Sequence, residues 1–166
     1  MQTGIALGSN LGDRLAGLRA GRDFLLALHE GPAPAAVSPV YETDPVGCPP
    51  GSFAFLNAVL EIETSLEPDV LLTRLAAFEH TLGRPAERSV NAPRPLDLDI
   101  LYAGANEIRS ADLTLPHPRL AERRFVLQPL ADLRPHLVLP GQSRSVWQLL
   151  AALPAEPQVR PFGSVW

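Results

Sequence analysis

The chain has 166 residues and a net charge of −4, which suits one compact domain and argues against binding nucleic acid or membranes through bulk charge. All 14 of its basic side chains are arginine. Walker-A NTPases and protein kinases place a lysine on the nucleotide phosphates, so both classes are excluded. A chain of this composition that handles phosphate must use arginine, histidine, backbone N–H groups or a metal ion.

The single cysteine, Cys48, excludes an internal disulfide framework and fits a reducing compartment. The first eight residues lack the basic region and long apolar run of a signal peptide. No stretch approaches the roughly 20 apolar residues of a membrane span. We therefore expect a soluble, cytoplasmic protein.

Apolar periodicity and turn residues divide the chain into alternating elements. The first half predicts a strand at 3–7, a helix at 13–28, strands at 35–43 and 53–64, and a helix at 68–82 that Gly83 caps. The second half predicts a strand through 97–99, a turn at 104–106 with a short return strand near residue 108, helices near 120–133 and 146–153, and an extended tail. The order β-α-β-β-α-β predicts an α+β fold, with a ferredoxin-like core, a C-terminal hairpin and a helical extension.

The strongest chemical signal is an Arg/Pro loop that runs into a strand with two carboxylates. Asp97 and Asp99 alternate with Leu96, Leu98 and Ile100, so both acids share one face, with Cα atoms about 6.5 Å apart. Two like charges this close favour a cation between them, and Mg²⁺ suits carboxylate oxygens together with substrate phosphates. The solvated face of an edge strand is the alternative interpretation.

Three arginines, Arg84, Arg88 and Arg94, precede the two acids. The guanidinium group binds phosphate oxygens in a bidentate manner. Beside two carboxylates that favour a divalent cation, these arginines indicate a Mg²⁺–polyphosphate site. Plain ion pairs between the arginines and Asp97 or Asp99 are the alternative.

A third cluster surrounds His117, which lies between two prolines and is followed by Arg119, Arg123 and Arg124. The flanking prolines restrict the backbone of the histidine. A lone histidine is usually structural, but one that is fixed beside arginines is a candidate phosphate ligand.

Seven short motifs occur in order: GSNLG at 8–12, VSPVYET at 37–43, FLNA at 55–58, LGR at 82–84, PRPLDLDIL at 93–101, LPHPR at 115–119 and RRFVLQPL at 123–130. Together they resemble the 6-hydroxymethyl-7,8-dihydropterin pyrophosphokinases of folate biosynthesis, from residue 4 to about residue 135. The resemblance implies one pyrophosphokinase domain over 1–166, with a core at about 1–135 and a C-terminal extension at 136–166.

The resemblance implies transfer of pyrophosphate from ATP to the pterin hydroxymethyl group, with release of AMP. It implies that Asp97 and Asp99 hold two Mg²⁺ ions and that the catalytic residues are these acids with Arg84 and Arg94. The implied ATP-binding residues are Glu79, Arg84, Arg94, His117 and Arg123. The implied pterin-binding residues are Thr43, Val46, Phe55, Asn57 and Phe125, with the two rings on the pterin faces and Asn57 at its amide edge. A flat heteroaromatic ring suits two aromatic faces, and an asparagine amide offers both a donor and an acceptor.

Two other classes remain open from the sequence. Nucleotidyltransferases also combine Gly-Ser with D-x-D, but their acids follow closely, whereas Gly8 and Asp97 are far apart here. A non-catalytic binding module could retain a pterin or nucleotide pocket, although every charged member of the motifs is present.

The resemblance implies that the partners are the small molecules ATP and hydroxymethyldihydropterin, and we expect the protein to be a monomer. Ala92 and Pro95 depart from the family pattern and stiffen the approach to the acidic strand.

Overall fold

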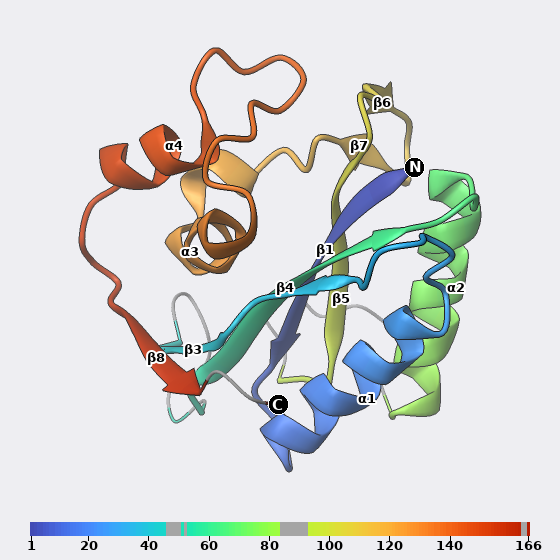
Figure 1. Ribbon diagram of the computed structural model, residues 1–166. Coiled ribbons are helices and arrows are strands. Elements are labelled where there is room, and N and C mark those ends of the chain that lie inside the picture. Colours follow the sequence, from blue (N-terminus) through green and yellow to red (C-terminus); the bar gives the residue numbers. More distant parts are fainter. Residues whose placement is uncertain (46–50, 52, 84–92, 164–165) are drawn as a thin grey trace.

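The computed structural model describes residues 1–45, 51, 53–83, 93–163 and 166, which form an antiparallel sheet between two layers of helices (Figure 1). The sheet contains β1 (Gln2–Ser9), β2 (Ala36–Val37), β3 (Val40–Thr43), β4 (Phe55–Glu63), β5 (Asp97–Ala103) and β8 (Val159–Gly163). Its strand order is β5-β1-β4-β3-β8, and β2 also pairs with β4. The predicted mixture of helices with an antiparallel sheet is confirmed.

Two helices cover each face of the sheet (Figure 1). On one face lie α1 (Arg14–Leu26) and α2 (Pro68–Thr81), and on the other lie α3 (Arg124–Leu133) and α4 (Val146–Ala152). A 3₁₀ turn, Leu120–Glu122, precedes α3. The described helices include none that is long and apolar enough to cross a membrane.

Alternation along the strands divides the core between the two faces. On β4, Leu60 and Ile62 pack with α1 and α2, whereas Val59 packs with α3 and α4. On β5, Leu98 and Ile100 are buried on the α1/α2 face, as their period of two predicts. Asp97 and Asp99, which alternate with them, therefore point to the α3/α4 face.

Local sequence explains where the first two helices begin and end. The Asp13 carboxylate accepts a hydrogen bond from Ala16 N at 3.0 Å and caps α1. Pro68 occupies the first turn of α2, where its missing N–H costs nothing. Gly83 follows α2 with φ 92°, which confirms it as the C-terminal cap.

The structure corrects the predicted hairpin after β5. A strand near residue 108 does form, β6 (Ile108–Arg109), but it pairs with β7 (Thr114–Leu115) and not with β5. This pairing buries Leu115 and packs Ile108 on the α1/α2 core. The predicted strand at 35–43 is also divided, since Pro39 between β2 and β3 has no N–H for the ladder.

The tail after residue 154 is extended, as expected, and it also joins the sheet. β8 pairs with β3 and forms an edge of the sheet. The indole Nε1 of Trp166 donates to Ser38 O at 2.8 Å, which anchors the end of the described chain in the core.

Candidate active site

Asp97 and Asp99 lie at the start of β5, and an arginine approaches each of them. Arg94 Nε is 3.4 Å from Asp97 Oδ2, and Arg123 Nη1 is 3.9 Å from Asp99 Oδ2. Both distances exceed the length of about 2.8 Å that a charge-assisted hydrogen bond has. The two carboxylate side chains are 20% and 43% exposed. The structure therefore brings two acids and two arginines together without tight pairing in these two contacts.

The acid pair suits a hydrated divalent cation. Among the described residues, no group of three or more Asp, Glu, His or Cys side chains could hold a metal ion. Mg²⁺ needs fewer protein ligands, because it binds one or two carboxylates and completes its shell with water and phosphate oxygens. Asp97 and Asp99 thus fit Mg²⁺ that arrives with a polyphosphate.

His117 is fixed beside the acids by its backbone and by one ring nitrogen. The backbone N–H of His117 donates to Leu101 O on β5 at 2.8 Å. The ring Nδ1 accepts from the backbone N–H of Arg119 at 3.2 Å. The neutral ring therefore carries its proton on Nε2. Burial, followed by the charges of Arg123 and Arg119, lowers the pKa of His117 to about 4. At neutral pH this side chain is an uncharged N–H donor.

The lowered pKa of His117 makes stability depend on pH. The unfolded chain takes up a proton near the ordinary pKa of about 6.5, whereas the folded chain resists protonation down to about pH 4, although the Asp97 charge opposes this shift. The free energy of unfolding should therefore fall as the pH drops from about 6.5 toward 4. Urea denaturation at a series of pH values should give a shallower fall for His117→Gln, because the other histidines are common to both proteins. Equal slopes would contradict a neutral His117.

One register row across the sheet connects the acids to the candidate pterin-binding residues. Gly8 on β1 pairs with Asp97 on β5 and with Asn57 on β4. Adjacent strands lie about 4.8 Å apart and paired residues share a face, so Asp97 and Asn57 flank Gly8 at a separation of about 10 Å. A Cβ at Gly8 would lie 3.8 Å from both Asn57 Oδ1 and Asp97 Cβ. Gly8 therefore leaves a hollow between a carboxylate and an amide.

The Asn57 amide is held in one orientation. It is 6% exposed, and its Nδ2 donates to the Thr43 hydroxyl on β3 at 2.9 Å. This bond leaves Oδ1 on the side of the Gly8 hollow. The structure thus brings Thr43 and Asn57 together.

Phe55 and Phe125 are half-buried, at the start of β4 and in the first turn of α3. The guanidinium of Arg123 lies 5.6 Å from the centroid of the Phe125 ring. In the described part of the chain, the one stacked aromatic pair is Phe24 with Phe78, against the α1/α2 core. Phe55 and Phe125 therefore do not stack on each other.

Glu79 reaches the outer edge of β5 from α2. Glu79 is buried, and its Oε1 accepts a hydrogen bond from the backbone N–H of Leu98 at 2.6 Å. β5 is an edge strand of the described sheet, so this N–H has no neighbouring strand to bond to, and Glu79 supplies its partner. A cleft of about 260 Å³ opens beside this contact. Its lining includes the apolar side chains of Leu72, Ile100 and Leu113 and the polar side chains of Asp99, Asp112 and His117. The cleft therefore connects Asp99 and His117 with the edge of β5.

Five residues of the sequence analysis lie outside the described residues. They are Val46, Cys48, Arg84, Arg88 and Ala92. The expected roles of Val46 and Arg84 therefore stay predictions.

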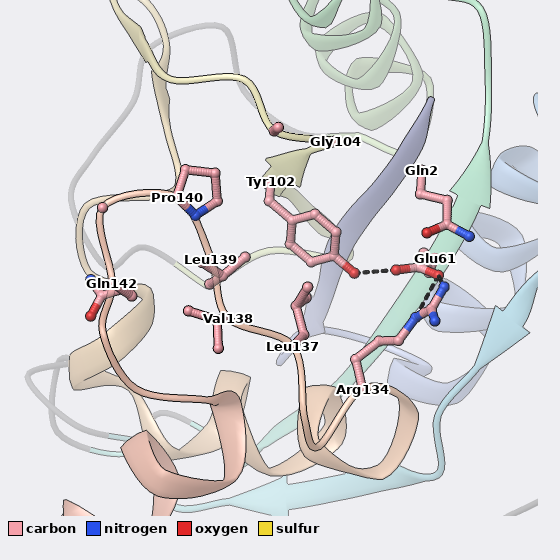
Figure 2. Close-up of a pocket in the computed structure, with 12 residues that line it drawn as sticks. Gln2, Glu61, Tyr102, Gly104, Arg134, Leu137, Val138, Leu139, Pro140 and Gln142 are labelled. Atoms are coloured by element: carbon pink, nitrogen blue, oxygen red, sulfur yellow. Dashed lines mark hydrogen bonds and ion pairs between the residues drawn. The ribbon is translucent and has the colours of Figure 1, made fainter.

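A larger cleft, of about 600 Å³, lies toward the other end of the sheet (Figure 2). Glu61 pairs there with Gly4, four residues before Gly8 on β1 and hence about 13 Å away. The Glu61 carboxylate accepts from Arg134 Nε at 2.9 Å through one oxygen and from the Tyr102 hydroxyl through the other. Figure 2 shows these three side chains converging beside the segment Leu137–Gln142. Because both carboxylate oxygens have protein donors, we assign this group to stability.

Three comparisons with known proteins show what this chain is similar to. Residues 4–135 match the family model of 7,8-dihydro-6-hydroxymethylpterin-pyrophosphokinase (HPPK). The chain is 46% identical over 129 residues to the 2-amino-4-hydroxy-6-hydroxymethyldihydropteridine pyrophosphokinase of Bacillus subtilis. This alignment covers 78% of this chain and 75% of the relative. It is 42% identical over 152 residues to the protein of the same name from Pseudomonas aeruginosa. That alignment covers 92% of this chain and 91% of the relative.

A crystal structure of an HPPK-DHPS in complex with substrates has a TM-score of 0.68 to this chain at 12% identity. The likeness covers 91% of this chain but 43% of that one, and at this identity it supports the fold alone. The sequence matches go further, since the family model spans most of the chain and the two relatives align over most of their own length. The chain therefore belongs to the 7,8-dihydro-6-hydroxymethylpterin-pyrophosphokinase family.

Proposed function

We infer that this protein transfers pyrophosphate from ATP to the hydroxymethyl group of 6-hydroxymethyl-7,8-dihydropterin, with release of AMP, in folate biosynthesis. The inference draws on family membership and on the names of the two bacterial relatives. The structural observation that carries it is the row Asp97–Gly8–Asn57. This row sets a carboxylate that suits Mg²⁺ and an amide that suits a pterin edge on either side of one hollow.

Asp97 and Asp99 would hold Mg²⁺, with two ions expected, and the metal supplies neutralisation of charge on the phosphate oxygens. Arg94, together with Arg84, would bind those oxygens from one side. His117 and Arg123 would bind them from the opposite side, the histidine as a neutral Nε2–H donor.

Release of AMP requires that the pterin hydroxyl oxygen attacks the β-phosphorus of ATP. The bond from that phosphorus to the oxygen bridging to the α-phosphate then breaks, and the hydroxyl loses its proton. Such a transfer depends on charge neutralisation and in-line positioning more than on a strong base. Asp97 borders the Gly8 hollow and is therefore the acid nearest the attacking hydroxyl in this proposal.

The pterin would lie over Gly8 with its ring faces against Phe55 and Phe125. Asn57 would bind the amide edge of the ring, with the backbone near Thr43 and Val46. The Thr43–Asn57 hydrogen bond supports this assignment, because it holds the amide ready before the substrate arrives. Two half-buried rings that do not stack on each other can each accept one face of a flat ligand.

The cleft at the edge of β5 would take the adenosine part of ATP. Its apolar side chains, Leu72, Ile100 and Leu113, suit a flat base, and the cleft reaches Asp99 and His117, where the phosphates would begin. Glu79 lines the same cleft and fixes the backbone of Leu98. We propose that Glu79 shapes the nucleotide site from there.

The strand order β5-β1-β4-β3, with α1 after β1 and α2 after β4, supports a ferredoxin-like class for the core. We propose that residues 1–166 act as one pyrophosphokinase domain, since α4 and β8 of the extension pack on the same sheet and helices as the core. A monomer in the cytoplasm stays our prediction.

The decisive experiment is a chromatographic assay with ATP, Mg²⁺ and 6-hydroxymethyl-7,8-dihydropterin that measures AMP against ADP. We expect AMP and a pyrophosphorylated pterin in equal amounts. ADP as the nucleotide product would indicate transfer of a single phosphoryl group from the γ-phosphorus. Tight pterin binding without any nucleotide product would favour the non-catalytic binding module.

Gly8→Ala tests whether the hollow receives the pterin. The added methyl would make ordinary contacts of 3.8 Å, so the fold and the Tm should be unchanged. It would also occupy part of the space between Asp97 and Asn57, and we expect the KM for the pterin to rise by about tenfold or more, in line with the loss of about 1.4 kcal/mol of binding.

The matched control for this variant is Gly163→Ala. Gly163 is also a strand glycine, and a Cβ there would meet nothing within 4 Å. Its steady-state kinetics should equal those of the wild type. An unchanged KM in Gly8→Ala would contradict a pterin that lies over Gly8.

A further inference from the structure

The backbone of Arg94 is held on both polar atoms by a single residue, Asn10, at the end of β1. Arg94 N donates to Asn10 Oδ1 at 2.9 Å, and Asn10 N donates to Arg94 O at 3.2 Å. Asn10 itself is fully buried. Because the Arg94 guanidinium lies beside Asp97, this clamp determines where that side chain starts.

The next residue of the same segment rests on α1. An ideal Cβ at Gly17 would come within 2.4 Å of Pro95 O, a separation that real Cβ atoms do not show. Only glycine therefore lets α1 approach the segment this closely. Two consecutive residues are therefore held from two sides: Arg94 by Asn10, directly after β1, and Pro95 by Gly17 on α1.

The Asn10 amide also bears a cost that hydrogen bonding does not offset. Its Nδ2 is buried and has no hydrogen-bond partner within the described residues. Buried polar atoms are normally paired, so an unpaired one in a fully enclosed side chain calls for a compensating gain. Placement of Arg94 supplies such a gain.

We propose that Asn10 and Gly17 are positioning residues for pyrophosphoryl transfer, since they fix the backbone from which Arg94 reaches the phosphates. The proposal rests on the inferred role of Arg94 in the proposed function. A long arginine side chain amplifies any movement at its base, and a displacement of about 1 Å at a reacting group costs about 100-fold in rate. This assigns a role to Asn10 in the 8–12 motif, where the side chain is fully buried.

The test measures the kinetics of Asn10→Ala by formation of AMP. We expect kcat to fall by about 10- to 100-fold, while the KM for the pterin stays within about twofold and circular dichroism shows a folded protein. Ser9→Ala is the matched control, because Ser9 is adjacent and equally buried and its Oγ has no hydrogen-bond partner in the described chain. Its kcat should equal that of the wild type.

A double-mutant cycle separates positioning from general damage. If Asn10 acts through Arg94, Asn10→Ala should lower kcat by less than about twofold in the Arg94→Ala background. Independent, multiplicative losses would overturn the proposal. Gly17→Ala displaces the same segment without touching Asn10, so it should give the same pattern and covers the case in which Asn10→Ala does not fold.

The outcomes distinguish this proposal from the role of Arg94 on which it rests. A large loss in Arg94→Ala, with wild-type kcat in both Asn10→Ala and Gly17→Ala, overturns the positioning role alone. Full activity in Arg94→Ala overturns the role of Arg94 and the positioning role together. Neither result bears on whether the wild-type enzyme forms AMP.

Discussion

Replacement of Asp99 by alanine is expected to abolish turnover and leave the fold intact. The Asp99 carboxylate is 43% exposed, and within the described residues the nearest paired guanidinium nitrogen is 3.9 Å away, so its removal breaks no tight ion pair there. It also relieves repulsion with Asp97, and the Tm should stay level or rise. AMP formation should fall by more than about 1,000-fold, because a charge-stabilising group at the reacting phosphates is lost.

The Asp99→Ala experiment needs two companions. Asp99→Asn keeps the shape of the side chain and removes only the charge, so it should lose activity to a similar extent. Glu107→Ala removes an exposed carboxylate outside the site and should have wild-type kinetics. An unfolded Asp99→Ala protein would point to a structural role, and a folded, fully active one would contradict the proposed metal site.

The faces of the strands could be predicted because each carries a period of two. Leu98 and Ile100 are buried on the α1/α2 face, and Asp97 and Asp99 turn to the other face, as the alternation requires. The approach of Arg94 to Asp97 follows from their closeness in sequence. Local pattern was therefore enough to indicate the acid pair and its first arginine.

Contacts between distant segments left no local signal. The alternation assigns Glu61 to a strand face, but no residue near Glu61 in the sequence indicates that Tyr102 and Arg134 are its hydrogen-bond partners. Register decides this contact, since Gly4 lies between Glu61 and Tyr102 and lets the tyrosine ring cross β1. The clamp between Asn10 and Arg94 is of the same kind, because it joins the residue after β1 to a residue that precedes β5, and only the sheet brings the two together.

The pairing of β8 was missed for a different reason. The tail carries prolines, which cannot donate to a ladder, and an extended segment was the most that its composition supported. Tertiary contact overrides this, because β8 needs only one partner at the edge, and Trp166 anchors the chain end in the core.

The second large effect is expected on stability, from Arg134→Met. The Glu61 side chain is 7% exposed, and Arg134 supplies two nitrogens to one of its oxygens. Without the guanidinium, the buried carboxylate keeps only the Tyr102 hydroxyl as a hydrogen-bond partner within the described residues. Loss of one member of a buried ion pair costs about 3–5 kcal/mol, and we expect about 3 kcal/mol because Arg134 is 39% exposed. For a chain of this length, the Tm should fall by about 10 °C.

The partner variants decide whether this loss comes from the stranded charge. Glu61→Leu combined with Arg134→Met removes both charges, so it should recover most of the stability that Arg134→Met loses. Arg160→Met breaks an exposed pair with Asp44 and should leave the Tm within error. Well below the Tm, Arg134→Met should form AMP at the wild-type rate, because Glu61 lies about 13 Å from the row through Gly8. A double variant no more stable than Arg134→Met would contradict the stranded carboxylate as the cause of the loss.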